Sequence, residues 1–184
     1  GCSSSVLKAV CERGMLEEYE KTVDRIPTSS IPTELVLQPL SEAQQTAMDQ
    51  IKAAWREKDV CLLHGVTSSG KTEIYIHLIN EMLAQGKQVL YMLPEIVLTS
   101  QLTDRLRKVF GDRLGVYHSR YTDAERVEVY RKQISDNPYE IIVGVRSSVL
   151  LPFHNLGMVI IDEEHETSFK QAEPAPRYHA RNVA

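Results

Sequence analysis

A phosphate-binding loop constrains this chain more than any other feature of its sequence. Residues 65–72 read GVTSSGKT and complete the pattern G-x-x-x-x-G-K-T, and the apolar run Val60–His64 leads directly into them. Glycines let such a loop curl so that successive backbone N–H groups point at a β-phosphate, and the following helix adds the positive end of its dipole. The segment therefore predicts a strand at Val60–His64, a helix that begins near Lys71, and a nucleoside triphosphate site between them.

Two side chains of this loop have tasks that follow from their positions. The Lys71 ammonium is placed to bridge the β- and γ-phosphates as a point charge, and the Thr72 hydroxyl is a ligand for Mg²⁺. The predicted nucleotide-binding residues are Gly65, Val66, Thr67, Ser68, Ser69, Gly70, Lys71 and Thr72. A nucleotide together with Mg²⁺ is thus the expected cofactor.

After the loop, helical patterns alternate with short apolar runs. The expected strands are Val89–Leu93, Gly115–His118, Ile141–Gly144 and Val159–Ile161, and the expected helices are 42–57, 71–85, 100–110 and 123–135. Gly86 follows the second helix as its stop. Continuous apolar strands separated by helices are typical of a parallel sheet with helices on both faces, so the predicted fold class is α/β.

The first part of the chain is expected to lie outside this fold. The prolines of Ile26-Pro27 and Ile31-Pro32 bias the residues before them toward extended structure. We expect a separate segment at 1–25, a linker at 26–38 and the main domain at 39–184. A chain of 184 residues with 42% hydrophobic residues can build one full core.

Charge and cysteine usage exclude several classes of protein. The net charge of −4 argues against a protein that coats nucleic acid by bulk electrostatics, although it leaves a local basic groove open. The three cysteines are too few and too scattered for a disulfide framework or a four-ligand zinc site. No run approaches the roughly 18 apolar residues of a membrane span, and no secretory signal is recognisable. We expect a cytoplasmic protein with no membrane partner.

An acidic cluster is the second informative site. The apolar run Met158–Ile161 ends at Asp162-Glu163-Glu164-His165. A protein with a phosphate-binding loop needs a carboxylate for Mg²⁺ at the end of a neighbouring strand, and Asp162 is placed to hold the ion through water. Glu163 can polarise the attacking water as a general base. Lys71, Asp162 and Glu163 are therefore the predicted catalytic residues, and a solvated acidic loop is the alternative interpretation.

Gln44 has two interpretations that the residues alone leave open. Ser41-Glu42-Ala43-Gln44 opens the helix before the loop, and Ser41 and Gln44 can satisfy its end N–H groups as a capping box. A glutamine just upstream of the phosphate-binding loop also suits adenine, because one amide can donate to and accept from the base edge.

Further motifs follow one another in a set order. They are Leu40-Ser41-Glu42-Ala43-Gln44, GVTSSGKT at 65–72, Leu93-Pro94-Glu95-Ile96, Tyr117-His118-Ser119, Val143–Ser148 and DEEH at 162–165. This order resembles the first motor lobe of superfamily 2 helicases, a RecA-like P-loop NTPase lobe. LPEI, HSR, GVRSSVLLPFHNLGMVIIDEEH and the closing FKQAEPAPRYHARNVA are similar to the primosomal, replication-restart helicases of bacteria over residues 40–184. Residues 1–25 resemble, more weakly, the end of the winged-helix domain that precedes the motor in that family.

The resemblance implies an ATP site and a DNA track. Gln44 would read adenine, so the nucleotide would be ATP. The strand-end residues Pro94, Glu95, Ile96, Gly144, Arg146 and Ser147 would face single-stranded DNA. Loops at strand ends can offer N–H groups, hydroxyls and a guanidinium to phosphates without reading sequence. For Arg146, an ordinary surface or salt-bridge arginine is the alternative.

Residues after the DEEH motif would couple DNA to the nucleotide. By resemblance His165 links the two sites, and the residues after it form an aromatic and basic loop made of Phe169, Lys170, Arg177, Tyr178, His179 and Arg181. Base stacking on such side chains tolerates any sequence. A packed aromatic with solvated cations is the alternative. Pro174-Ala175-Pro176 departs from the family pattern, which leaves the conformation of this loop open.

The resemblance further implies an ATP-dependent 3′→5′ DNA helicase for primosome assembly and restart of stalled replication forks. Its expected partners are single-stranded DNA, branched forks, single-stranded-DNA-binding protein and primosome or replicative-helicase-loading proteins. The second lobe of such motors supplies an arginine finger worth about 10³–10⁵ in rate, so we expect residues 1–184 alone to bind ATP but hydrolyse it slowly or not at all. Zinc is expected only in a part of the parent protein beyond these residues.

Two other functions fit the same residues. The first is a lobe of another superfamily 2 DNA translocase, in repair or restriction, which would keep every site assignment. The second is a nucleotide-gated interaction module, in which ATP changes partner affinity without strand separation.

Overall fold

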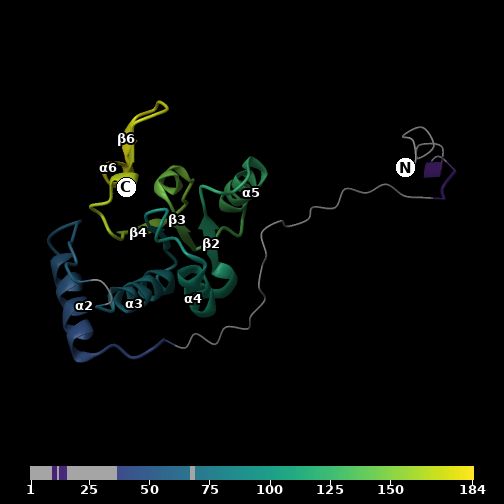
Figure 1. Cartoon of the computed structure of the whole chain (residues 1–184). Coiled ribbons are helices and arrows are strands. Elements are labelled where there is room, and N and C mark those ends of the chain that lie inside the picture. The colour runs from purple at the N-terminus through teal and green to yellow at the C-terminus, as the bar shows by residue number, and fades with distance from the viewer. Residues whose placement is uncertain (1–9, 12, 16–36, 67–68) are drawn as a thin grey trace.

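Four parallel strands form the centre of the described structure, a computed structural model that describes residues 10–11, 13–15, 37–66 and 69–184 (Figure 1). They are β1 (Gln88–Met92), β2 (Leu114–Tyr117), β3 (Ile141–Gly144) and β4 (Leu156–Ile161), in the order β2-β3-β1-β4. Leu90 at the middle of β1 lies opposite Ile142 of β3 and Val159 of β4. The four apolar runs after the phosphate-binding loop are therefore confirmed as strands of one parallel sheet.

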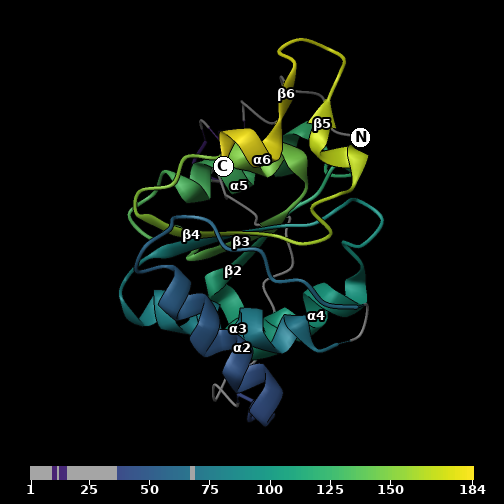
Figure 2. The ribbon, with the colours of Figure 1, turned by 90° about the vertical axis from the view of Figure 1, so that its left-hand side faces the viewer.

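Helices cover both faces of this sheet, as expected. Helices α2 (Glu42–Ala54), α3 (Lys71–Ala84) and α4 (Ser100–Phe110) lie on one face (Figure 2). The other face carries α5 (Asp123–Gln133), α6 (Ala180–Val183) and the short 3-10 helices η2 (Arg146–Leu150) and η3 (Thr167–Phe169). A third 3-10 helix, η1 (Gly111–Arg113), links α4 to β2. The predicted α/β fold class is confirmed.

Local sequence sets the ends of these helices. Ser41 and Thr122 each accept a hydrogen bond from the backbone N–H three residues later and complete a capping box with Gln44 and Glu125. Thr99 caps α4 in the same way. Gly86, the expected stop of α3, has φ 69°, which favours glycine.

The sheet separates two hydrophobic cores because successive side chains of a strand point to opposite faces. Val89 and Tyr91 of β1 pack with α2, α3 and α4, whereas Leu90 and Met92 pack with α5 and the C-terminal segment. Every residue of β1 is buried. This strand is therefore the element on which both cores depend.

The expected strand at Val60–His64 is wrong. These residues adopt no regular secondary structure and pair with none of the four sheet strands, and the Val60 and Leu62 side chains are 83% and 72% exposed. An apolar run favours burial, but a strand exists only through hydrogen bonds to a neighbour, and β4 is the end strand of the described sheet. Composition alone therefore could not decide this segment.

Other differences lie at element ends and near the C-terminus. Helix α2 ends at Ala54, three residues before its expected end at 57, and β4 begins at Leu156, three residues before Val159. A small hairpin of β5 (Lys170–Gln171) and β6 (Tyr178–His179) was not expected and projects beyond the sheet (Figure 2).

The expected winged-helix remnant at 1–25 and the linker at 26–38 lie almost wholly outside the described residues. Among the helices that the structure describes, none is long and apolar enough to cross a membrane.

A buried glutamine, Gln88, connects backbone segments at the amino ends of the strands, opposite the functional motifs. The Gln88 Oε1 accepts hydrogen bonds from the backbone N–H groups of His154 (2.8 Å) and Asn155 (3.1 Å), and its Nε2 donates to the Tyr139 carbonyl at 2.8 Å. One side chain at the start of β1 thus joins the segments that lead into β3 and β4.

We expect Gln88→Met to lower the free energy of unfolding by about 2–4 kcal/mol, because it leaves two backbone N–H groups without their acceptor. Urea unfolding of the chain would measure the loss. Gln101→Met, at an exposed position of α4, is the matched control and should change stability by less than about 0.5 kcal/mol. Equal stability of the two variants would contradict the assigned role of Gln88.

Candidate nucleotide site and nucleic-acid surface

The phosphate-binding loop depends on two glycines with little room around them. Gly70 has φ 83°, and a Cβ at this position would collide with the Gln44 Nε2. A Cβ on Gly65 would lie 2.9 Å from the Ser69 Oγ. Thr67 and Ser68 lie outside the described residues. The described parts of the loop thus curl too tightly for other residues at its two glycine positions.

Lys71 lies at the start of α3 and points back into the loop. Its ammonium donates to the carbonyls of Gly65 at 2.7 Å and Val66 at 3.2 Å. The helix begins at Lys71, as predicted, and Thr72 follows in its first turn. A lysine held by carbonyls inside the loop is available to an anion that enters there, since an anion is a stronger partner for an ammonium than a carbonyl is.

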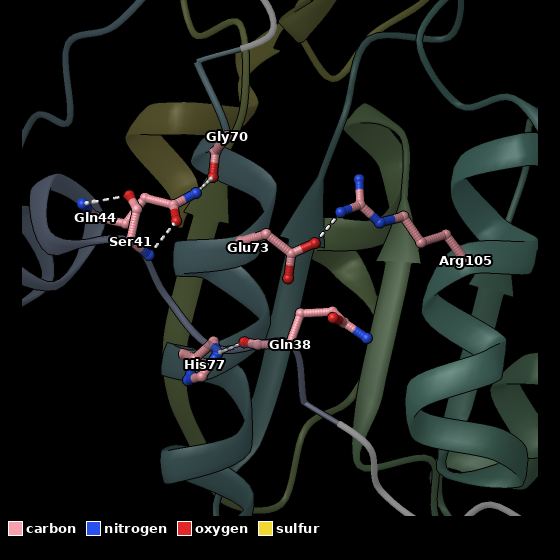
Figure 3. Close-up of polar contacts among 7 residues, drawn as sticks. All are labelled: Gln38, Ser41, Gln44, Gly70, Glu73, His77 and Arg105. Atoms are coloured by element: carbon pink, nitrogen blue, oxygen red, sulfur yellow. Dashed lines mark hydrogen bonds and ion pairs between the residues drawn. The ribbon is translucent and has the colours of Figure 1, made fainter.

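Gln44 connects the start of α2 to this loop (Figure 3). Its Oε1 accepts from the Ser41 N–H at 2.8 Å, which confirms the capping box. Its Nε2 donates to the Gly70 carbonyl at 3.1 Å. The amide therefore caps α2 and contacts Gly70, the residue just before α3, while its contact with adenine stays a prediction.

Ion pairing and hydrogen bonding hold α3 between its neighbours. Glu73 of α3 pairs with Arg105 of α4, and His77 Nε2 is hydrogen bonded to the Gln38 carbonyl at 2.8 Å (Figure 3). The helix that carries Lys71 is thus tied to residues on both sides of it.

Asp162 and Glu163 follow β4 directly. The Asp162 backbone N–H donates to the Met92 carbonyl at 3.0 Å, so the ladder between β1 and β4 extends to this residue. The Asp162 Oδ2 accepts from the Tyr91 hydroxyl at 3.0 Å, and its Oδ1 accepts from the Glu163 N–H at 3.1 Å. Glu163 has φ 49°. This left-handed conformation is uncommon for residues other than glycine and is more frequent at functional sites.

Two tyrosines place the P-loop helix next to this acidic cluster. The ring of Tyr75, one turn after Lys71 on α3, meets the ring of Tyr91 edge-on with centroids 5.6 Å apart. Burial raises the pKa of the Tyr75 phenol well above its ordinary value, and the charges of Asp162 and Glu163 raise it further. Lys71 and Tyr75 share a helix face. The start of α3 therefore lies beside the carboxylates, although 91 positions separate Lys71 from Asp162 (162 − 71).

The donor set fits Mg²⁺. Thr72 and Asp162 offer a hydroxyl and a carboxylate, the oxygen ligands that this ion prefers. Among the described residues, no group of three or more His, Cys, Asp or Glu side chains could hold a metal ion by itself. Mg²⁺ commonly keeps several waters and binds through one or two protein groups together with nucleotide phosphates.

The remaining residues of the DEEH motif have partners of their own. Glu164 pairs with Arg181 of α6 at 2.6 Å. His165 is mostly exposed, and its Nε2 lies 3.8 Å from the Glu163 Oε2. The motif is therefore linked to α6 through Glu164, while Asp162 is bound to Tyr91.

The predicted DNA-facing residues lie at the carboxyl ends of β1 and β3, at the same sheet edge as Asp162, because all four strands are parallel. Ile96 is largely exposed, and Gly144 has no room for a Cβ, which would lie 2.6 Å from the Ser148 Cβ. Glu95 and Ile96 line a groove whose other lining residues include Thr99, Arg107, His118 and Arg120. The sequence prediction included neither arginine as a site residue, although the HSR motif at 118–120 was an available signal.

Arg146 contacts backbone of the predicted aromatic and basic loop. Its Nη1 donates to the carbonyls of Ser168 at 3.3 Å and Lys170 at 2.9 Å. Neither a DNA phosphate nor a surface salt bridge is needed to explain this geometry. The guanidinium instead joins the end of β3 to the start of β5.

Phe169 differs from the expectation of an exposed stacking residue. Its side chain is 1% exposed and packs in the core under α5 and α6, because the 3-10 turn of η3 directs it inward. In this conformation Phe169 cannot stack on a base, so that prediction is wrong. The alternative of a packed aromatic agrees with the structure. Lys170 and Arg177 are exposed, whereas Tyr178 and His179 are partly buried in β6.

The Pro174-Ala175-Pro176 segment forms the tip of the β5–β6 hairpin. The Gln171 Nε2 donates to the carbonyls of Pro174 and Pro176, each at 3.0 Å. His179 accepts at Nδ1 from the Arg181 N–H at 3.3 Å and so caps α6. The tip is thus held by one amide from its own base.

The crowding around Gly70 allows a test of whether the loop conformation is needed for nucleotide binding. We expect Gly70→Ala to weaken binding of a fluorescent ATP analogue by more than about tenfold, because the new Cβ would displace Gln44 and strain a left-handed residue. Gly86→Ala is the matched control, since Gly86 has φ 69° with no atom within 4 Å of a Cβ. It should bind the analogue like the wild type, and equal weakening in both variants would contradict a local effect.

Comparisons with known proteins agree with this arrangement. Residues 41–184 match the model of the DEAD/DEAH box helicase family. The chain is 43% identical over 187 residues to replication restart protein PriA of Bacillus subtilis (strain 168), a match that covers 99% of this chain and 23% of the relative. It is 38% identical to the same protein of Synechocystis sp. (100% and 22% covered) and 41% identical to that of Chlamydia pneumoniae (79% and 20% covered).

These similarities confirm the resemblance to bacterial replication-restart helicases. The chain spans about a fifth to a quarter of the length of the curated relatives named above. With a family match over residues 41–184, a parallel sheet covered on both faces and the loop and acidic cluster at neighbouring positions, the chain belongs to the DEAD/DEAH box helicase family.

Proposed function

We propose that residues 39–184 are the ATP-binding first lobe of an ATP-dependent 3′→5′ DNA helicase that restarts stalled replication forks. The observation that carries the proposal is the position of the P-loop helix beside Asp162 and Glu163, through the contact of Tyr75 with Tyr91. The similarity to replication restart protein PriA over nearly the whole chain supports the pathway. Residues 1–25 are proposed as the end of a winged-helix domain and 26–38 as a linker.

In this proposal the loop binds the phosphates of ATP. Backbone N–H groups of the loop and of the start of α3 would donate to the β-phosphate, and Lys71 would exchange its carbonyl partners for phosphate oxygens. Gln44 turns its amide toward adenine. Thr72 would bind Mg²⁺ directly and Asp162 would bind it through water. When bound, the ion would neutralise part of the charge of the phosphates.

Glu163 is the proposed general base. Its carboxylate accepts a proton from the water that attacks the γ-phosphorus, the bond from that phosphorus to the bridging oxygen breaks, and ADP leaves with phosphate. Asp162 fixes the backbone of Glu163 through the Oδ1 contact. For residues 1–184 by themselves we infer slow or absent turnover, since motors of this kind take an arginine from a second lobe.

The proposed DNA track runs along the sheet edge. Glu95 and Ile96 line a groove that also includes Arg107 and Arg120, whose guanidinium groups can contact phosphates without reading sequence. Pro94, which precedes them, is buried. Gly144 ends β3, the strand beside β1, and Arg146 and Ser147 follow it. Arg146 would couple this track to the aromatic and basic loop, and His165 would couple it to Glu163.

The proposed partners are single-stranded DNA and branched forks in the cytoplasm, together with single-stranded-DNA-binding protein and primosome or helicase-loading proteins. A motor from repair or restriction would share every residue assignment. The proteins named as replication restart proteins favour the restart pathway over those alternatives.

We expect Glu163→Gln in the complete parent protein to reduce DNA-stimulated ATP hydrolysis by at least about 100-fold while ATP binding is retained, because the proton acceptor is lost. A phosphate-release assay with and without single-stranded DNA would measure this. Glu166→Gln, three positions later, removes the same charge and is the control. Hydrolysis that is independent of DNA, or absent in the parent, would overturn the motor and favour a nucleotide-gated interaction module.

We expect Arg146→Ala to reduce the stimulation of ATP hydrolysis by DNA by about tenfold, with nucleotide affinity within about twofold of the wild type. The substitution removes the hydrogen bonds to the Ser168 and Lys170 carbonyls and so releases the loop. Arg131→Ala, at an exposed position of α5, is the control. Unchanged stimulation in the Arg146 variant would contradict its coupling role.

A further inference from the structure

Tyr91 places a polar group at a position where an apolar side chain would suffice. It lies near the carboxyl end of β1 with 0% exposure, and Val89 of the strand and Leu93 just after it belong to the same core. A hydroxyl in such a core is costly unless it has a hydrogen-bond partner. Its partner is the Oδ2 of Asp162, at 3.0 Å.

Asp162 receives one donor on each carboxylate oxygen. The Tyr91 hydroxyl reaches Oδ2, and the Glu163 N–H reaches Oδ1 at 3.1 Å. Two donors at opposite oxygens fix the rotation of the carboxylate. Each oxygen keeps acceptor capacity for a further partner such as a metal-bound water.

The position of the Tyr91 hydroxyl is itself fixed from the helix of the phosphate-binding loop. The Tyr75 ring packs against the Tyr91 ring at an interplanar angle of 70°, and both side chains are buried. Tyr75 lies one turn after Lys71. The carboxylate is therefore aligned from the same helix that presents Lys71 and Thr72.

We propose that Tyr91 is a positioning residue that aligns the Asp162 carboxylate for the divalent cation bound with the nucleotide. This inference rests on the proposed function, in which Asp162 is a ligand of that cation through water. Hydrogen bonds to metal-binding carboxylates fix their orientation, and removal of such partners typically lowers metal affinity about 10–100-fold. The same alignment holds Glu163, because its N–H is bound to the other oxygen of Asp162.

The test uses Tyr91→Phe in the complete protein, since this change removes the hydroxyl and retains the ring. Mn²⁺ serves as the probe cation, and electron paramagnetic resonance measures free Mn²⁺ during titration in the presence of saturating ADP. We expect an apparent affinity for Mn²⁺ about tenfold weaker than that of the wild type. ADP affinity in excess EDTA should be unchanged, because that measurement excludes the cation.

Tyr130→Phe is the matched control, because Tyr130 lies exposed on α5 and loses the same hydroxyl. It should bind Mn²⁺ like the wild type. A melting temperature for Tyr91→Phe close to that of the wild type would show that the chain remains folded. If Tyr91→Phe were unfolded, Tyr91→Met, which lacks the hydroxyl but also fills the core position, would replace it in the titration with the same expected loss. Where Tyr91→Phe is folded, the same change in an Asp162→Asn background should have no further effect on Mn²⁺ affinity.

Asp162→Asn separates failure of this inference from failure of the proposed function. Weakened Mn²⁺ binding in Asp162→Asn together with wild-type binding in Tyr91→Phe would overturn the role of Tyr91 alone. Wild-type Mn²⁺ binding in Asp162→Asn would overturn the role of Asp162 in the proposed function. An equal loss of ADP affinity with and without the cation would show that Tyr91 acts on general structure and would also overturn the inference.

Discussion

The pairing of β1 with β3 and β4 is the constraint on which the rest of the described structure depends. All residues of β1 are buried, and their alternate side chains enter two separate cores. Burial on both faces leaves the backbone no water to bind, so its N–H and carbonyl groups must pair with neighbouring strands. The parallel pairing that results brings residues 94–96, 144–147 and 162–165 to one edge of the sheet.

Two buried side chains of β1, Gln88 and Tyr91, carry polar groups that are hydrogen bonded. Gln88 binds three backbone groups at one end of β1, and Tyr91 binds Asp162 toward the other. A buried polar group that loses its partner is costly, which makes these contacts specific as well as stabilising. The strand therefore fixes both the scaffold and the orientation of the candidate metal-binding carboxylate.

Local patterns predicted much of the fold because local chemistry decides helix ends and strand composition. The α4 helix at 100–110 and the β3 strand at 141–144 have their expected bounds. Val60–His64 has the same composition as a buried strand but pairs with no strand of the described sheet, since pairing depends on a distant neighbour. For Phe169 the sequence left base stacking and core packing both open, and packing against α5 and α6 decided for the core.

The sequence by itself determined the phosphate-binding loop, the acidic cluster, the helix caps and the alternation of strands and helices, since each is written in residues close together in the chain. Only the tertiary structure decided which distant groups meet. It brings the Tyr91 hydroxyl to Asp162 and the Gln44 amide to the Gly70 carbonyl. It also brings Arg146 to the carbonyls of Ser168 and Lys170. These contacts depend on strand order and on the packing of helices against the sheet, which no short stretch of sequence encodes.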